Sequence, residues 1–504
     1  MTTATIESRT DLLDRMQYCA DEPADTAIDD ILGPWERPLA AALQAKEGAE
    51  GAAPLATSIA EAASQWQDQW DKLSAVSAIF PQWPDNASVA AWRPPEGVAR
   101  EISAPLQTYL QAGRVLPEWA DRDRIARAEA LFMEYGALSV TLLFCSSLPE
   151  CYVIPDLAAV LHTTGQLERH TEHRIRSTGA MVFPVMMKGG LLSPDGGGIA
   201  QILKVRLIHA TVRNLILRGK PEAAVKALGA QENTVGAGVV APLPGLFGTK
   251  DMHQALFAHG WKTGEEGLPC NQEELAYTLL TFSYVFLRSM RKLGLALPKA
   301  DEEAYLHAWN VAGHVLGIRR ELMADTMAGA EDLFTAMQAR GRVDRPPNPA
   351  PKPDPRPSLG AALMNAMSRV IPVSVAKPFP ELMTRYLCGG ASSRDLGLTG
   401  PVKAVSLLLF VLLMVSVRGI DWLVRQAYPQ FSISRFLTRL LGYQLMTKLM
   451  MDQTRPLKLP EHVRGGIDSV VAQWSYDPKA PKWMNTLEDR LTTKGSWTPS
   501  APGK

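Results

Sequence analysis

The amino-acid sequence predicts an all-α protein built around one large helical domain. Long stretches place apolar residues three and four positions apart, which is the spacing of one face of an α-helix. The short alternating runs that are typical of β-strands are scarce. Residues suited to helix ends also stand at the borders of several of these stretches. A chain of 504 residues has room for two or three domains, but a single large helical domain accounts for the same length.

The first 120 residues are rich in Ala, Gln and Pro, have weak periodicity and are expected to form a peripheral region. The core is expected over residues 121–340. Within it, the apolar spacing over residues 121–144 is first helical and then becomes apolar all round, as in a buried helix. Residues 157–183 resemble one or two further helices, which end in a loop rich in Gly and Pro.

Two later helices of this core have clear end signals. Residues 198–219 end in Gly219, a residue suited to the position just after a helix. Residues 271–294 open with Asn271 in a capping position and with Glu274 three residues on, which imitates a capping box. Both stretches are therefore predicted helices.

Residues 301–318 are predicted to be helical with Asp301 as the N-terminal cap. Seven prolines between residues 341 and 358 predict an extended, non-helical linker. Beyond the linker, residues 359–460 are expected to supply helices that complete the core. The tail, residues 461–504, is polar and is expected to wrap the surface.

The longest apolar run, residues 404–417, belongs to a predicted apolar helix over residues 404–424. A membrane-spanning helix needs about 20 apolar residues, and this run soon meets Arg418 and Asp421. A buried core helix, a helix lying in a membrane interface and a true span all stay open. Trp422 suits the interfacial alternative.

Charge and cysteine usage limit the partners and the compartment. Lys and Arg number 52, as do Asp and Glu, so the balance offers no electrostatic case for binding nucleic acid. The N-terminus shows no basic segment followed by an apolar one, the pattern of a secretion signal. Five cysteines without C-x-x-C spacing indicate reduced thiols. A cytoplasmic protein is expected, with peripheral membrane association if residues 404–424 dock.

One histidine stands between two arginines in the predicted helix KVRLIHATVRNL. Arg206 lies three residues before His209 and Arg213 lies four after it, so all three share a face within about 60°. Buried guanidinium groups need anionic partners. Neighbouring positive charges also favour the neutral imidazole, which is the metal-binding form. One ligand explains the trio: a haem, whose iron suits the imidazole and whose two propionates suit the arginines.

A second explanation of the trio stays open at this point. A histidine on an apolar helical face is commonly a core residue, and buried arginines commonly pair with Asp or Glu of another helix. Upstream, the side chains of His170, Thr171, Arg174, Ser177 and Thr178 share one helical face. This polar face either lines a pocket shared with the His209 helix or is exposed to solvent.

At these residues the chain resembles the latex-clearing-protein family of rubber oxygenases, which includes the prenyl-cleaving oxygenase of mycophenolate biosynthesis. The similarity covers about residues 120–330 and 360–460. It is carried by the order and spacing of the motifs RIRST (174–178), RLIHATVR (206–213), NQEELAYTLLTFSYVFLR (271–288), EAYLHAWNVAGHVLGI (303–318) and RYLCGG (385–390).

This resemblance implies an all-helical, globin-like core that binds haem b and uses dioxygen to cleave carbon–carbon double bonds of isoprenoid chains. By position in the motifs, His209 matches the haem iron ligand, and Arg206 and Arg213 match the arginines that flank it. Arg385 matches a further family arginine, which the resemblance places at the cofactor. An oxygenase acting on a small apolar, isoprenoid- or lipid-like substrate is the expected function.

On the opposite side of the haem, Arg174 and Thr178 match a family arginine and threonine, and Ser177 lies between them. Some family members carry a lysine at the position of Ser177, where it can occupy the sixth iron position. Serine is not an equivalent amine ligand, so this position is expected to be open, bound by water, or held by His170 or His173.

Two rival functions are considered. A di-iron or zinc bundle would use Glu-x-x-His or His-Glu-x-x-His pairs, and the sequence contains only HTEH at residues 170–173. A non-enzymatic protein that binds lipid or isoprenoid and docks on a membrane through residues 404–424 would need no haem. The absorption spectrum of the purified protein separates the haem hypothesis from both.

Overall fold

The structure is a computed structural model of the chain. It describes residues 9–33, 59–155, 157–158, 160, 171–218, 261, 263–342, 354–371, 373–426, 432–433, 435–437, 439–440 and 482–492. Across these residues every regular element is a helix and no strand occurs, so the all-α prediction is confirmed.

The helices fall into three consecutive groups along the chain. The N-terminal group consists of α1 (Arg9–Met16), α2 (Glu22–Leu32), α4 (Ile59–Ile79), η1 (Phe80–Gln82), α5 (Asn86–Ala91) and α6 (Arg100–Gly113). The central group consists of α7 (Arg122–Glu134), α8 (Gly136–Leu142), the π-helix η2 (Leu143–Ser147), α9 (Leu148–Cys151), α12 (Thr171–Met186), α13 (Gly198–Leu217), α16 (Thr263–Glu266), α17 (Gln272–Phe282), α18 (Tyr284–Lys292) and α19 (Lys299–Val315). The C-terminal group consists of η4 (Arg320–Leu322), α20 (Met327–Arg342), α21 (Arg356–Val370), η5 (Ser374–Ala376), α22 (Phe379–Cys388), α23 (Gly390–Asp395), α24 (Ala404–Arg425) and α27 (Lys482–Thr492).

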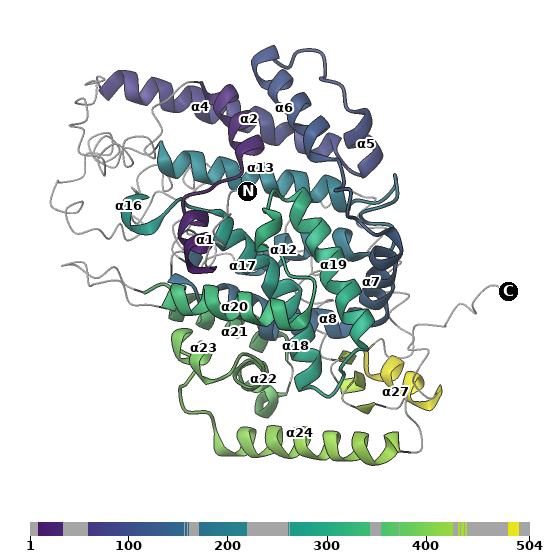
Figure 1. Ribbon diagram of the computed structural model, residues 1–504. Coiled ribbons are helices and arrows are strands. Elements are labelled where there is room, and N and C mark those ends of the chain that lie inside the picture. The colour runs from purple at the N-terminus through teal and green to yellow at the C-terminus, as the bar shows by residue number, and fades with distance from the viewer. Residues whose placement is uncertain are drawn as a thin grey trace, which may run out of the picture.

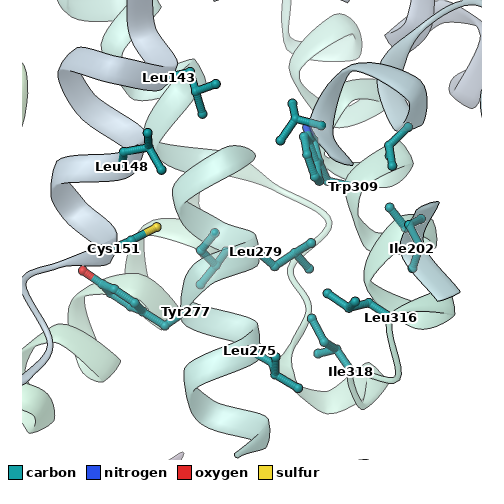
Figure 2. Close-up of a cluster of buried hydrophobic side chains, with 14 of the residues drawn as sticks. Leu143, Leu148, Cys151, Ile202, Leu275, Tyr277, Leu279, Trp309, Leu316 and Ile318 are labelled. Carbon is teal, nitrogen blue, oxygen red and sulfur yellow. The ribbon is translucent and has the colours of Figure 1, made fainter. Parts of the chain in front are cut away.

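The core lies where the central helices meet (Figure 1). In that view α13 runs across the upper part of the molecule, α17 and α19 stand below it, and α24 lies along the base. Figure 2 shows Leu275 and Leu279 of α17 between Leu148 of α9 and Ile202 of α13. All four side chains are buried, so α17 lies in the core between α9 and α13.

The sequence predicted a peripheral region over residues 1–120, but α1 and α2 contribute directly to the core. Leu13, Met16, Ile28 and Ile31 are almost completely buried. Helix α2 packs against both α13 and α6. Its role is therefore to support α13, the helix that carries His209.

The sequence predicted a non-helical linker over residues 341–358, but helices extend into both ends of this stretch. Helix α20 continues to Arg342, and α21 begins at Arg356, with Pro357 in its first turn. Proline is tolerated there because the first turn does not use its backbone N–H groups for helical hydrogen bonds. Residues 343–353 lie outside the described residues.

The helix caps agree with the prediction at one site and differ at another. Asn271 caps α17 by accepting a hydrogen bond from the backbone N–H of Glu274 at 3.0 Å, as predicted. Asp301, in contrast, lies inside the first turn of α19, which starts at Lys299, and its carboxylate binds Arg127 at 2.6 Å. An acidic residue in a first turn still favours the helix through its dipole, so the sequence signal was real, but it placed the N-cap three residues after the observed one, Pro298.

Helix α24 is not a buried core helix. Only 17 % of its most apolar stretch is buried, although it is, within the described residues, the one unbroken helix long and apolar enough to cross a membrane. The core-helix alternative for residues 404–424 is therefore wrong, and the membrane alternatives stay predictions.

Candidate functional site around His209

Helix α13 carries two different flanks around His209. At about 100° per residue, Arg206 and Arg213 project to one side of the imidazole, and Val205 and Val212 project to the other. The two arginines are buried, whereas the valines and His209 are only partly covered. His209 therefore stands at the border between a charged, buried flank and an apolar, half-open flank.

On the charged flank, Arg206 is fully bonded. Its Nε and second terminal nitrogen donate to the two oxygens of Asp21 at 2.5 and 2.7 Å, and its first terminal nitrogen donates to the carbonyl of Val315 at 3.0 Å. Burial disfavours its charge, but the carboxylate of Asp21 outweighs burial, so the pKa of Arg206 is raised.

Arg213 is engaged in the same way about two turns further along. It donates to Asp25 at 2.6 Å and to the carbonyls of Pro269 and Cys270 at 3.0 and 2.7 Å. Cys270 has a positive φ of 52°, a strained conformation for a residue with a side chain, and Arg213 binds its carbonyl directly. Burial raises the pKa of Asp25 to about 6 although Arg213 acts in the opposite direction.

The pairing repeats along both helices. Arg218, at the end of α13, binds Asp29 of α2 at 3.0 Å. The three aspartates are four residues apart and therefore line one face of α2. The anionic partners that buried arginines require are thus carboxylates of α2, which was the second explanation that the sequence left open. The four-residue spacing of Asp21, Asp25 and Asp29 was the available signal, but nothing in it pointed to a partner nearly 190 residues away.

The other flank of α13 is apolar and incompletely covered. Ile208 is 46 % exposed, and Val205 and Val212 are partly buried. His209 lies among them at helical spacing, and its Nδ1 atom is buried.

The loop between α12 and α13 is held rigidly, which fixes how the two helices meet. The side-chain amide of Asn86 donates to the carbonyls of Gly190 and Ser193, both at 2.9 Å, and its oxygen accepts from the N–H of Ala200 at 3.2 Å. Glu129 accepts from the N–H of Gly189 at 2.8 Å. Because α12 packs directly against α13, the expectation that these two helices are neighbours is confirmed.

Arg174, Ser177 and Thr178 of the upstream polar face lie on α12, but not all of their side chains are described. Arg174 and Ser177 are in its first half, and only their backbone is described; Thr178 is partly buried. His170 lies outside the described residues. The structure therefore brings the helix that carries these residues against α13, while their side-chain distances to His209 stay a prediction.

A cavity beside α12 tests where a porphyrin can fit. It measures about 20 Å³, the size of a single water molecule. Its walls come from several helices: Phe132, Ser139, Leu143, Ser147, Val182, Phe183, Phe282, Phe286, Tyr305 and Trp309. This space is far too small for a haem. His209 offers a different setting, an imidazole, which is a donor that can hold haem iron, among the aliphatic side chains of α13.

Comparisons with known proteins agree with this helical architecture. Residues 249–419 match the family model described as the ER-bound oxygenase mpaB/B'/rubber oxygenase catalytic domain. A rubber oxygenase of Streptomyces sp. (strain K30) is 23 % identical over 332 residues, covering 65 % of this chain and 67 % of the relative. The structure of latex clearing protein LCP in the closed state has a TM-score of 0.52 at 17 % identity, covering 91 % of this chain and 90 % of the other.

By these comparisons the chain is similar to the rubber oxygenase family, and the family match lies over residues 249–419. The matched range 249–419 contains helices α16 to α23 and most of α24, and it begins after α13. The alignment with the Streptomyces relative is longer, at 332 residues, and therefore extends beyond this range.

Arg385, the remaining predicted cofactor residue of this rubber oxygenase homologue, is not brought to the apolar flank. It lies on α22, pairs with Glu381 of the same helix and donates to the carbonyl of Gly400 at 2.6 Å. Figure 1 shows α22 in the lower part of the molecule and α13 in the upper part. Its immediate role is therefore local to α22 and the segment that leads to α24.

A second polar cluster was not predicted as a site. Glu150 is completely buried and binds Arg288 at 2.7 Å, Gln338 at 2.9 Å and Ser392 at 2.8 Å. Four segments that are distant in the sequence thus meet at one carboxylate. Beside it, a cleft of about 550 Å³ opens between α18 and α20 and includes Arg288 and Gln338 in its wall. In the sequence, Glu150 is a single glutamate after an apolar run, and nothing there indicated that residues from three distant helices would bind it.

Proposed function

We propose that this rubber oxygenase homologue is a haem b-dependent oxygenase that acts on a small apolar, isoprenoid- or lipid-like substrate with dioxygen as co-substrate. The observation that carries the proposal is the flank of α13 on which His209 stands among Val205, Ile208 and Val212. Its place in an oxygenase family supports the reaction class.

In this proposal His209 would hold the haem iron, and the three aliphatic side chains would line the space for the cofactor. Haem supplies the iron centre for dioxygen chemistry when it is bound. Arg174, Ser177 and Thr178 of α12 are the residues proposed to face the reacting side, where hydroxyl and guanidinium groups orient polar atoms. The aliphatic side chains of this flank suit an apolar substrate.

Arg206 and Arg213 keep a place in the proposed haem site, but their contribution is a positioning one. Their guanidinium groups are occupied by Asp21 and Asp25, so they fix the rotation of α13 about its axis. That rotation decides whether the imidazole of His209 faces the apolar flank. Arg385 has no role in this proposal because its partners lie on α22 and before α24.

The proposed reaction class is oxidative cleavage of a carbon–carbon double bond. One dioxygen and one double bond give two carbonyl groups, so both oxygen atoms end in the products and no external reductant is consumed. A short polyisoprenoid such as squalene, dispersed in mild detergent, is a suitable probe substrate.

The test is to incubate the haem-loaded full chain with squalene under ¹⁸O-labelled dioxygen and to analyse the products by mass spectrometry. Carbonyl fragments carrying the label are expected from the wild type. His209→Ala is expected to yield none, whereas His314→Ala is the matched histidine control on α19 and is expected to retain activity. Labelled products from His209→Ala at the wild-type rate would contradict the proposal. A haem-loaded wild type that leaves several apolar olefins unchanged would favour the non-enzymatic, lipid-binding alternative.

A further inference from the structure

Helix α24 exposes an unusually large apolar surface. Eleven of its apolar side chains are exposed: Val405, Leu407, Leu408, Leu409, Val411, Leu412, Leu413, Val415, Ile420, Trp422 and Leu423. Leu408 is 58 % exposed and Trp422 is 65 % exposed. Continuous apolar surfaces of this kind on a protein mark an interaction site.

A narrow stripe of buried residues, which runs along the length of α24, packs against the rest of the protein. Ser406, Phe410, Val417 and Asp421 are the buried positions, and they follow one another at helical spacing. The ring of Phe410 packs edge-on against Phe379 at 5.5 Å. Because the stripe runs from one end of α24 to the other, the helix lies flat on the protein, along the base in Figure 1.

The charges of α24 are arranged around this apolar surface in a specific way. Its one acidic residue, Asp421, is turned inward and accepts hydrogen bonds from the backbone N–H of Ile433 at 2.5 Å and the hydroxyl of Ser432 at 3.1 Å. Lys403, just before the helix, is exposed, and so is Arg418, which also donates a hydrogen bond to the hydroxyl of Tyr386 on α22 at 2.6 Å. The exposed face is therefore apolar with cations at its rim and no carboxylate.

We propose that α24 docks this protein onto a lipid bilayer that contains anionic lipids, with the helix axis parallel to the membrane plane. Aliphatic side chains enter the acyl region, while Lys403 and Arg418 reach the phosphate layer. Trp422 places an amphipathic ring at the same boundary. This surface is independent of the proposed haem site and does not rest on it.

The geometry favours a bilayer over a second copy of the chain. The exposed apolar positions cover roughly two thirds of the helix circumference, since successive residues turn by about 100°. A rigid protein partner buries one side of a helix, whereas fluid acyl chains surround whatever the protein leaves uncovered. A transmembrane orientation would require the full-length stripe through Phe410 and Val417 to detach from the protein.

Vesicle flotation tests the proposal. The full chain is mixed with vesicles of phosphatidylcholine, or of phosphatidylcholine with phosphatidylserine, and centrifuged through a density gradient. The wild type is expected to float, more strongly with phosphatidylserine, and to be released by alkaline carbonate. The double variant Leu408→Asp/Leu412→Asp is expected to bind at least about tenfold more weakly, because the burial of two leucines is lost.

The control replaces an exposed apolar residue outside α24 by aspartate. Val115→Asp replaces a side chain that is 61 % exposed and lies just after α6, and it is expected to float like the wild type. Circular dichroism checks that all variants are folded, since none of the changed side chains is in the core. Quenching of tryptophan fluorescence by brominated lipid, compared with Trp422→Phe, reports the shallow depth of the ring.

Three results would overturn docking. The first is a wild type that stays at the bottom of the gradient with both vesicle types. The second is a double variant that floats as well as the wild type. The third is a wild-type dimer in analytical ultracentrifugation that the double variant converts to a monomer, which would assign the face to a second copy of the chain. Resistance to alkaline carbonate would overturn the in-plane orientation in favour of a span.

Discussion

At the scale of single residues, buried ion pairs decide how α13 is oriented. Arg213 and Asp25 are both nearly inaccessible to water, and each would be left as an uncompensated charge without the other. Such a pair contributes little net stability compared with an apolar pair, but removing one member is strongly destabilising. The pair therefore specifies one rotation of the helix more than it adds to stability.

Replacing Arg213 by Met is expected to lower the free energy of unfolding by about 3–5 kcal/mol, because Asp25 stays buried without its cation. The double variant Arg213→Met/Asp25→Leu should recover most of this loss. Arg127→Met, which breaks the half-exposed pair with Asp301, should cost less than about 1 kcal/mol and is the matched control. Denaturation in urea measures all three. Equal losses for Arg213→Met and Arg127→Met would show that α13 is not held by the buried pair.

Lys204 provides a pH-dependent test of burial in the same helix. Burial lowers its pKa from 10.5 to about 8 in the folded protein. Since the charged form is disfavoured in the fold, the wild type is destabilised below pH 8 by at most about 3 kcal/mol, and this penalty disappears as pH rises from 8 to 10.5. Lys204→Met is therefore expected to be more stable than the wild type at pH 7, with an advantage that shrinks over that window. An advantage that is constant from pH 7 to pH 10 would refute this explanation.

At the scale of elements, the tight loop before α13 positions the helix pair. A β-carbon on Gly190 would lie 2.2 Å from the carbonyl oxygen of Pro184 and 2.7 Å from that of Val185. Both obstacles are backbone atoms of α12, which have little freedom to move. The loop can therefore close only with glycine at this position, and the approach of α12 to α13 depends on it.

Gly190→Ala is expected to lower stability by roughly 2–4 kcal/mol, because the added carbon overlaps backbone atoms in a packed region. Gly400→Ala is the control, since a β-carbon there meets nothing within 4 Å. Thermal unfolding followed by circular dichroism compares the two. If Gly190→Ala unfolds at the wild-type temperature, the loop is not the rigid connection described here.

Local signals predicted the helices themselves well, and their failures have physical causes. The cap at Asn271 was predicted because it depends on neighbours within one turn. The interruption at Ser283, between α17 and α18, was missed because its residues are compatible with a continuous helix. The start of α19 was placed late because Asp301 serves the first turn and binds Arg127 instead of capping.

At the scale of the whole molecule, long-range contacts were beyond the reach of sequence patterns. The trio around His209 correctly marked a helix with two buried arginines, but their partners on α2 lie more than 180 residues earlier. Burial of Glu150 by segments from α18, α20 and α23 was equally invisible. Periodicity identifies the face of a helix that is buried, whereas only the fold identifies what covers it.

The two proposed functional surfaces lie at different ends of the molecule. Figure 1 shows α13 in the upper part and α24 along the base. A chain docked through α24 would therefore hold the His209 flank away from the bilayer. Variants of α24 and of α13 should consequently affect vesicle binding and haem binding separately.

The most direct test of the account is the absorption spectrum of the purified full chain after titration with haem. The wild type is expected to develop a sharp Soret band that saturates at one haem per chain. His314→Ala should give the same spectrum, while His209→Ala should lose the band or bind haem only weakly and without saturation. A wild type that stays colourless with excess haem, or a His209→Ala variant with an unchanged Soret band, would contradict the assignment of His209 as the iron ligand.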